Sequence, residues 1–96
     1  MHFLLFYEKA PNFAEAQKPF ADAHHAYLQG LANRGHLLYG GNLENPTDGS
    51  AALLYQAGTQ AAVESFANND PYVLNGIVNK WTARPWDIVI GSALKS

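Results

Sequence analysis

Residues 13–33 carry the longest helical pattern in the chain, and this pattern constrains the fold more than any other feature. At about 100° per residue, a helix over this segment separates apolar from polar side chains. One side takes Phe13, Ala16, Phe20, Ala23, Tyr27 and Leu31, and the other takes Glu15, Lys18, Asp22, His25, Gln29 and Asn33. The rest of the chain must therefore supply an apolar layer for the helix to cover.

Proline and glycine set the limits of this helix. Pro19 inside a helix would remove one hydrogen bond at a cost of about 3 kcal/mol, but proline suits the first helical position. We therefore expect a loose turn after Asn12, a main helix from near Pro19 to about Asn33, and a stop at Gly35.

The remaining segments predict four strands and a second helix. The strands are expected at residues 3–7, 36–39, 51–56 and 77–90, with Gly40-Gly41 closing the second strand. Asn45 to Gly49 is a turn signal between the second and third strands. Thr59 is the expected N-cap of a helix over residues 59–68, and Ala62, Val63 and Phe66 form its inner edge. Trp86, Ile88 and Ile90 alternate with Asp87 and Val89, as in a half-buried strand.

The order β-α-β-β-α-β predicts one α+β domain over residues 1–96. This is the ferredoxin-like split βαβ arrangement, an antiparallel sheet with both helices on one face. A second copy of the chain could cover the other face and close two sheets into a barrel-like dimer. A homodimer is also a natural way for a chain of 96 residues to bury more surface.

Composition excludes several classes of function. The net charge is −2 and the six Lys and Arg residues are scattered, so we expect no nucleic-acid partner. The absence of cysteine excludes disulfides, thiolate metal sites and a cysteine nucleophile. The N-terminus lacks the pattern of a signal peptide, and no segment has the roughly 20 apolar residues of a membrane span. We therefore expect a cytoplasmic protein without a membrane partner.

His24 falls on the apolar side of the first helix and is the first candidate for chemistry. It is either a hydrogen-bonded core residue or part of a site. Asp70 is its candidate partner, although Asp70 before Pro71 is also a typical helix start. The two roles are compatible, since one carboxylate oxygen can cap while the other faces the imidazole. Such a pair is a general acid–base dyad.

Three more residues are candidates for holding a substrate. The Tyr72 hydroxyl could orient a substrate oxygen, or the ring could simply be packed. Gly40 and Gly41 could let a ligand approach backbone N–H groups, or they could form a bulge or bend. No spacing of His, Asp and Glu matches a metal signature, so no metal is expected, and Trp81 and Trp86 are expected in the core or at a dimer contact.

Several segments together resemble the YciI-like (YCII-related) family. They are Pro19 to Leu28, Gly35 to Leu43, Asp70-Pro71-Tyr72, Asn75-Gly76 and Trp86. The resemblance implies a ferredoxin-like fold of the dimeric α/β-barrel type and a His–Asp active site at His24 and Asp70. It also implies proton transfer on a small oxygenated ring compound, because one relative is a dehydrochlorinase and muconolactone isomerase shares the fold type. Ala21 stands where many members carry an arginine, Asn42 where proline is frequent, and His25 where leucine is common.

Three functions remain open at this point. The first is an enzyme that performs a cofactor-independent elimination, isomerisation or hydrolysis with His24 and Asp70. The second is a small-molecule binding or interaction module without chemistry. The third is a haem protein that uses a histidine ligand.

Overall fold

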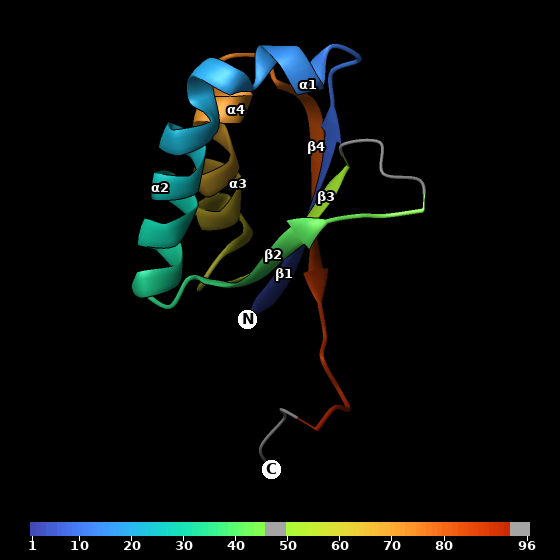
Figure 1. The fold of residues 1–96 in the computed structure, drawn as a ribbon. Helices are drawn as coiled ribbons and strands as arrows, with labels where there is room; N and C mark the ends of the chain where they lie inside the picture. Colours follow the sequence, from blue (N-terminus) through green and yellow to red (C-terminus); the bar gives the residue numbers. More distant parts are fainter. Residues whose placement is uncertain (46–49, 93–96) are drawn as a thin grey trace.

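The computed structural model describes residues 1–45 and 50–92. These residues form four strands and four α-helices (Figure 1). The strands are β1 (His2–Lys9), β2 (Leu37–Asn42), β3 (Ala51–Gln56) and β4 (Val78–Trp86). The helices are α1 (Phe13–Ala16), α2 (Ala21–Asn33), α3 (Gln60–Asn68) and α4 (Pro71–Leu74), with a 3-10 turn at Lys18–Phe20.

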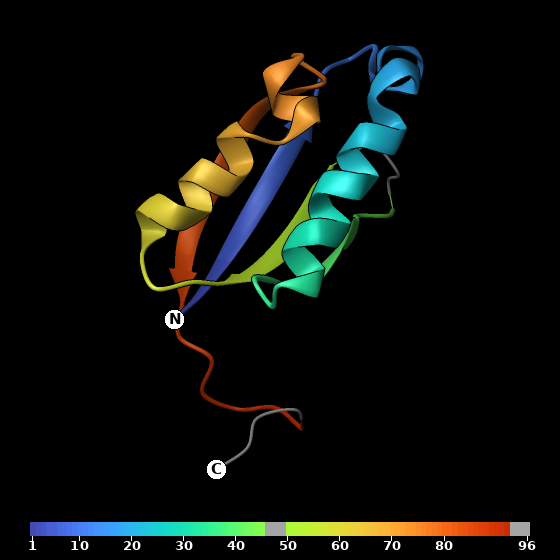
Figure 2. The same cartoon turned by 90° about the vertical axis from the view of Figure 1, so that its left-hand side faces the viewer.

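The strands form one antiparallel sheet in the order β2-β3-β1-β4. Helices α2 and α3 lie side by side on one face of this sheet (Figure 2). This is the α+β, ferredoxin-like arrangement that the sequence predicts.

The alternation of side chains along β1 explains where the core sits. Phe3, Leu5 and Tyr7 point to the helical face and are buried. Their neighbours in register include Tyr55 and Leu53 of β3, which are buried as well. Leu31 from α2 and Val63 and Ala67 from α3 cover these side chains.

The opposite face of the sheet, which we call the outer face, has no helix on it in the described part of the chain (Figure 2). Leu4 pairs with Leu54 in the register, and Phe6 pairs with Ala52. Phe6 is 38% exposed and Trp86 is 43% exposed. The outer face is therefore apolar over its middle strands.

The helical pattern of residues 13–33 is interrupted near Pro19, as expected, but Ala23 does not lie on the apolar side to which the pattern assigns it. Helix α1 ends at Ala16, and the 3-10 turn that contains Pro19 separates it from α2. Ala23 is exposed, whereas Leu28 and Ala32 pack against the core. Tyr27 and Leu31 keep their expected side, and only the edges of the apolar side differ, because a 3-10 turn advances differently from an α-helix.

Two strands have limits that differ from the expected ones. Gly40 and Gly41 lie inside β2, opposite Leu53 and Ala52, and do not close the strand. β4 ends at Trp86, which pairs with His2 at the very start of β1, so residues 87–90 have no strand beside them. Val89 and Ile90 are consequently exposed, and the chain leaves the sheet there (Figure 1). Residues 46–49 of the expected turn lie outside the described residues.

Candidate active site

Asp70 is a fully buried carboxylate at the junction of α3 and α4. Its Oδ1 accepts a hydrogen bond from the backbone N–H of Tyr72 at 2.9 Å and so caps α4. The same Oδ1 lies 2.7 Å from His24 Nδ1, and Oδ2 accepts from the Tyr7 hydroxyl at 2.9 Å. The cap and the imidazole contact therefore coexist on one carboxylate.

The partners of Asp70 fix the role of each ring nitrogen of His24. A backbone N–H and a tyrosine hydroxyl already donate to the carboxylate, as expected for its ionised form. We therefore assign Nδ1 as the third donor. In the neutral imidazole, Nε2 then carries the lone pair.

Tyr7 is a permanent donor in this network. Burial raises the pKa of its hydroxyl far above the usual value, and the negative charge of Asp70 raises it further. The hydroxyl therefore stays protonated and keeps its hydrogen bond to Oδ2.

The Tyr72 ring stacks on the face of the His24 imidazole. The two rings are stacked, with centroids 3.7 Å apart and planes inclined by 4°. The Tyr72 hydroxyl donates to Gln17 Oε1 at 3.0 Å, and Phe13 meets the ring edge-on. Burial, followed by the charge of Asp70, raises the pKa of this hydroxyl.

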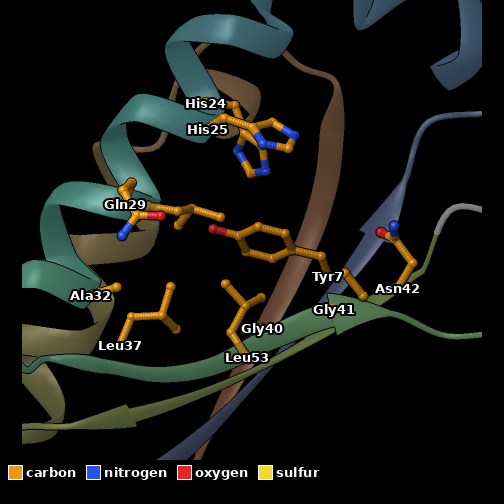
Figure 3. Close-up of a pocket in the computed structure, with 12 residues that line it drawn as sticks. Tyr7, His24, His25, Gln29, Ala32, Leu37, Gly40, Gly41, Asn42 and Leu53 are labelled. Atoms are coloured by element: carbon orange, nitrogen blue, oxygen red, sulfur yellow. The ribbon is translucent and has the colours of Figure 1, made fainter.

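His24 also borders open space. Its side chain is 13% exposed, and it lines two neighbouring hollows. The first hollow, of about 280 Å³, lies between α2 and the sheet, and its lining includes Tyr7, Leu28, Leu37, Gly40, Gly41 and Leu53 (Figure 3). The second, of about 510 Å³, is lined by residues that include Lys9, Phe13, Gln17 and Tyr72. His24, His25 and Asn42 line both.

The structure thus brings the residues singled out from the sequence into one region. His24, Asp70 and Tyr72 are in mutual contact, and Gly40 and Gly41 line the same hollow as His24. The Tyr72 hydroxyl is bonded to Gln17, so it is the ring that contacts the imidazole. His25 is exposed, as predicted, and it nevertheless lines both hollows.

Sequence reasoning missed Tyr7, Asn42 and Gln17. Tyr7 had a usable signal, because it alternates with Phe3 and Leu5 on the buried side of β1, and a buried tyrosine hydroxyl usually finds a partner. Asn42 and Gln17 carry no such signal, since each is an ordinary polar residue near the end of an element.

Two further observations concern residues 1–45 and 50–92. Within these ranges, no three His, Asp or Glu side chains are grouped closely enough to hold a metal ion. None of the helices there is long and apolar enough to cross a membrane.

The family model described as the YCII-related domain matches residues 1–87. No curated protein matches the chain. Among solved structures, the chain is similar to 5-chloro-2-hydroxyhydroquinone dehydrochlorinase from Burkholderia phenoliruptrix AC1100, in complex with 2,5-dihydroxybenzoquinone. The TM-score is 0.76 at 24% identity, covering 91% of this chain and 94% of the other.

Proposed function

The chain belongs to the YCII-related family, and on this premise we propose that it is a small-molecule enzyme with His24 and Asp70 as its acid–base dyad. The proposed reaction is a proton transfer that needs no cofactor, on a small oxygenated ring compound. Elimination, isomerisation and hydrolysis all fall within this class.

One observation carries the proposal. His24 Nδ1 lies 2.7 Å from the buried Oδ1 of Asp70, while the same imidazole borders open hollows. A carboxylate on one ring nitrogen sets the tautomer and stabilises the imidazolium, which leaves the other nitrogen to exchange protons. The stacked Tyr72 ring limits the orientations that the imidazole can take.

The proposed step is a proton abstraction by Nε2. Nε2 takes a proton from the substrate, and Asp70 stabilises the positive charge that results. The electron pair left behind forms a new double bond, and in an elimination the leaving group departs with its bonding pair. In an isomerisation, the imidazolium returns the proton to another atom of the same molecule. Gly40 and Gly41 lie across the first hollow, where backbone groups can contact the bound ring.

The dehydrochlorinase supports this class of reaction by analogy. Its name describes the loss of a proton and a chloride from a hydroxylated ring, and its complex contains a ring compound with oxygen substituents. The two chains share the fold, which by itself does not fix a substrate. We therefore use the analogy only to choose the compounds to assay, which are hydroxylated rings with and without a halogen.

We also propose that the protein is a homodimer that pairs through the outer face of the sheet. Leu4, Phe6, Leu54 and Trp86 lie on this face, and the described helices leave it uncovered. A second copy would bury these side chains, which favours association.

The experiment is a turnover assay on hydroxylated ring compounds with and without a halogen, beginning with 5-chloro-2-hydroxyhydroquinone. Release of chloride and consumption of the ring compound are followed with the wild-type protein and with His24→Gln. His36→Gln is the matched control, because His36 contacts Gln56 O and lies outside both hollows. We expect turnover that is lost in His24→Gln and kept in His36→Gln. Equal rates in wild type and His24→Gln contradict the dyad, and a ligand that binds but is recovered unchanged favours the binding module.

A further inference from the structure

Tyr7 connects the sheet to the buried carboxylate that contacts His24. Its ring reaches from β1 toward α2 and lines the first hollow (Figure 3). Its hydroxyl donates to Asp70 Oδ2 at 2.9 Å, and the residue is only 2% exposed. The other oxygen, Oδ1, contacts His24 Nδ1 and the backbone N–H of Tyr72. Within the described ranges, the bond from Tyr7 is thus the hydrogen bond that Oδ2 accepts.

In the described part of the chain, Asp70 pairs with one imidazole and acts on four tyrosine hydroxyls. The tyrosines are Tyr7 from β1, Tyr27 from α2, Tyr55 from β3 and Tyr72 from α4. For each of them burial is the first cause of a raised pKa, and the negative charge of Asp70 is a further cause. All four hydroxyls therefore stay neutral while a histidine titrates, so their charge does not compensate that of the carboxylate.

Two further basic groups lie near His24 on the side of the hollows. The His25 ring meets the His24 ring edge-on, with centroids 5.7 Å apart. Lys9, from the end of β1, lines the second hollow together with both histidines. Both groups are retained when only the Tyr7 hydroxyl is removed, so a comparison of the wild type with Tyr7→Phe isolates the effect of that hydroxyl.

The hydrogen bond from Tyr7 changes how strongly Asp70 acts on the imidazole. Donors to a carboxylate stabilise its ionised form and share its negative charge among them. A buried carboxylate with fewer donors acts more strongly on the remaining partner, and here that partner is the imidazolium of His24. Burial, followed by the charge of Asp70, raises the pKa of the Tyr7 hydroxyl far above its usual value. Tyr7 therefore donates to Oδ2 over the whole range in which His24 gains or loses a proton.

We propose that Tyr7 is a positioning residue that sets the basicity of His24 through Asp70. By donating to Oδ2, Tyr7 weakens the attraction between the carboxylate and the imidazolium, so His24 releases the proton on Nε2 more readily. The neutral imidazole, which the proposed step needs as its base, is then present at lower pH. This inference rests on the proposed function for its catalytic meaning, whereas the coupling itself needs only these three side chains.

The test compares the binding of a proton by His24 in the wild type and in Tyr7→Phe. The ring ¹⁵N shifts of His24 are followed as the pH is changed, with no substrate present. We expect the proton-binding constant of the imidazole to rise about three- to tenfold in Tyr7→Phe, because Asp70 loses a donor. Tyr55→Phe is the matched control, because it removes a buried hydroxyl that has no hydrogen-bond partner among the described residues. It should leave the constant unchanged.

A second measurement uses the unmodified protein, in case Tyr7→Phe does not fold. The proton of the Tyr7 hydroxyl shares Asp70 with His24, so its NMR signal should move as His24 titrates and with the same midpoint. The Tyr27 hydroxyl is the internal reference, because it donates to the carbonyl oxygen of Phe66 at 2.7 Å. Its signal should move less than that of Tyr7.

Several results would overturn the inference. These are an equal or lower proton-binding constant in Tyr7→Phe, an equal rise in Tyr55→Phe, and a Tyr7 hydroxyl signal that does not follow the titration of His24. In the turnover assay, the rise of the rate with pH should move to higher pH in Tyr7→Phe, because the base must be neutral.

The outcome is independent of the proposed function. If His24→Gln loses turnover but Tyr7→Phe leaves the proton-binding constant unchanged, the dyad stands and the role of Tyr7 fails. If the constant rises as expected but wild type and His24→Gln have equal rates, the coupling stands and the catalytic dyad fails.

Discussion

The imidazole of His24 and the ring of Tyr72 are stacked, with centroids 3.7 Å apart. The His24 Nδ1 and the Tyr72 backbone N–H are both within hydrogen-bond distance of Asp70 Oδ1. The turn that begins α4 therefore places the carboxylate and the stacking ring together. Because Asp70 and Tyr72 are two positions apart, one helix cap orients the whole imidazole.

The stack predicts different results for two substitutions of Tyr72. Tyr72→Phe keeps the ring and loses only the hydrogen bond to Gln17, so turnover should stay within about threefold. Tyr72→Leu removes the stack and frees the imidazole, and turnover should fall about 10- to 100-fold. The ring-proton shifts of His24 provide a readout without a substrate, since the ring-current effect should persist in Tyr72→Phe and vanish in Tyr72→Leu. An unchanged His24 signal in Tyr72→Leu would contradict the stacking.

Tyr7→Phe should destabilise the fold. It removes a donor from a carboxylate that is fully buried, at a cost of about 1–3 kcal/mol. Tyr55→Phe is the matched control, because the Tyr55 hydroxyl is buried with no hydrogen-bond partner among the described residues, so its removal should be neutral or stabilising. Urea denaturation of both variants measures the difference, and equal losses of stability would show that the Tyr7 hydrogen bond contributes nothing specific.

Buried tyrosines predict a loss of stability at alkaline pH. Burial is the main cause that raises the pKa of both Tyr7 and Tyr55 above the ordinary value of 10.0. Because the pKa is raised in the folded state, the contribution of each tyrosine to stability is fully present below pH 10. Above pH 10 this contribution falls, since the tyrosine ionises in the unfolded chain but not in the folded one. The slope is about 1.4 kcal/mol per pH unit for each such tyrosine.

Thermal unfolding between pH 8 and 11 checks this dependence. The wild type should lose stability above pH 10, and Tyr55→Phe should lose less over the same interval. A Tyr55→Phe curve parallel to that of the wild type would show that Tyr55 does not contribute to the alkaline transition.

The outer face predicts the oligomeric state. Light scattering should give the mass of two chains, where one chain is 10.5 kDa, and Phe6→Glu should give the mass of one. Leu74→Glu is the control, because Leu74 is an exposed apolar residue of α4 and does not belong to the outer face. A monomeric wild type, or a dimeric Phe6→Glu variant, would contradict pairing through this face.

Local signals in the sequence predict much of this arrangement. The helical phase of His24 and the Asp-Pro helix start of Asp70 are both visible in the chain, and the fold class follows from the order of the elements. The exact phase of α2 could not be predicted, because it depends on how the 3-10 turn at Pro19 joins two helices. The end of β4 depends on where its neighbour β1 begins, a non-local relation that alternation in the sequence does not contain.

The site is only partly encoded in such local patterns. Tyr7 lies 63 positions from Asp70, and its hydrogen bond arises only when the sheet and α3 are packed. Lys9 and Asn42 are separated by 33 positions and meet because β1 and β2 both run antiparallel to β3, so both strands end at the same end of the sheet. Gly40 and Gly41 were expected to end a strand, yet they continue it and border the hollow.

The tautomer of neutral His24, read from ¹⁵N chemical shifts of its ring, tests the central claim most directly. The other three histidines serve as internal references in the same spectrum. We predict that Nδ1 is protonated, because it donates to Asp70, and that Nε2 is unprotonated and available as the base. A neutral ring with its proton on Nε2 would contradict the dyad, because Nε2 would then have no lone pair to accept a proton.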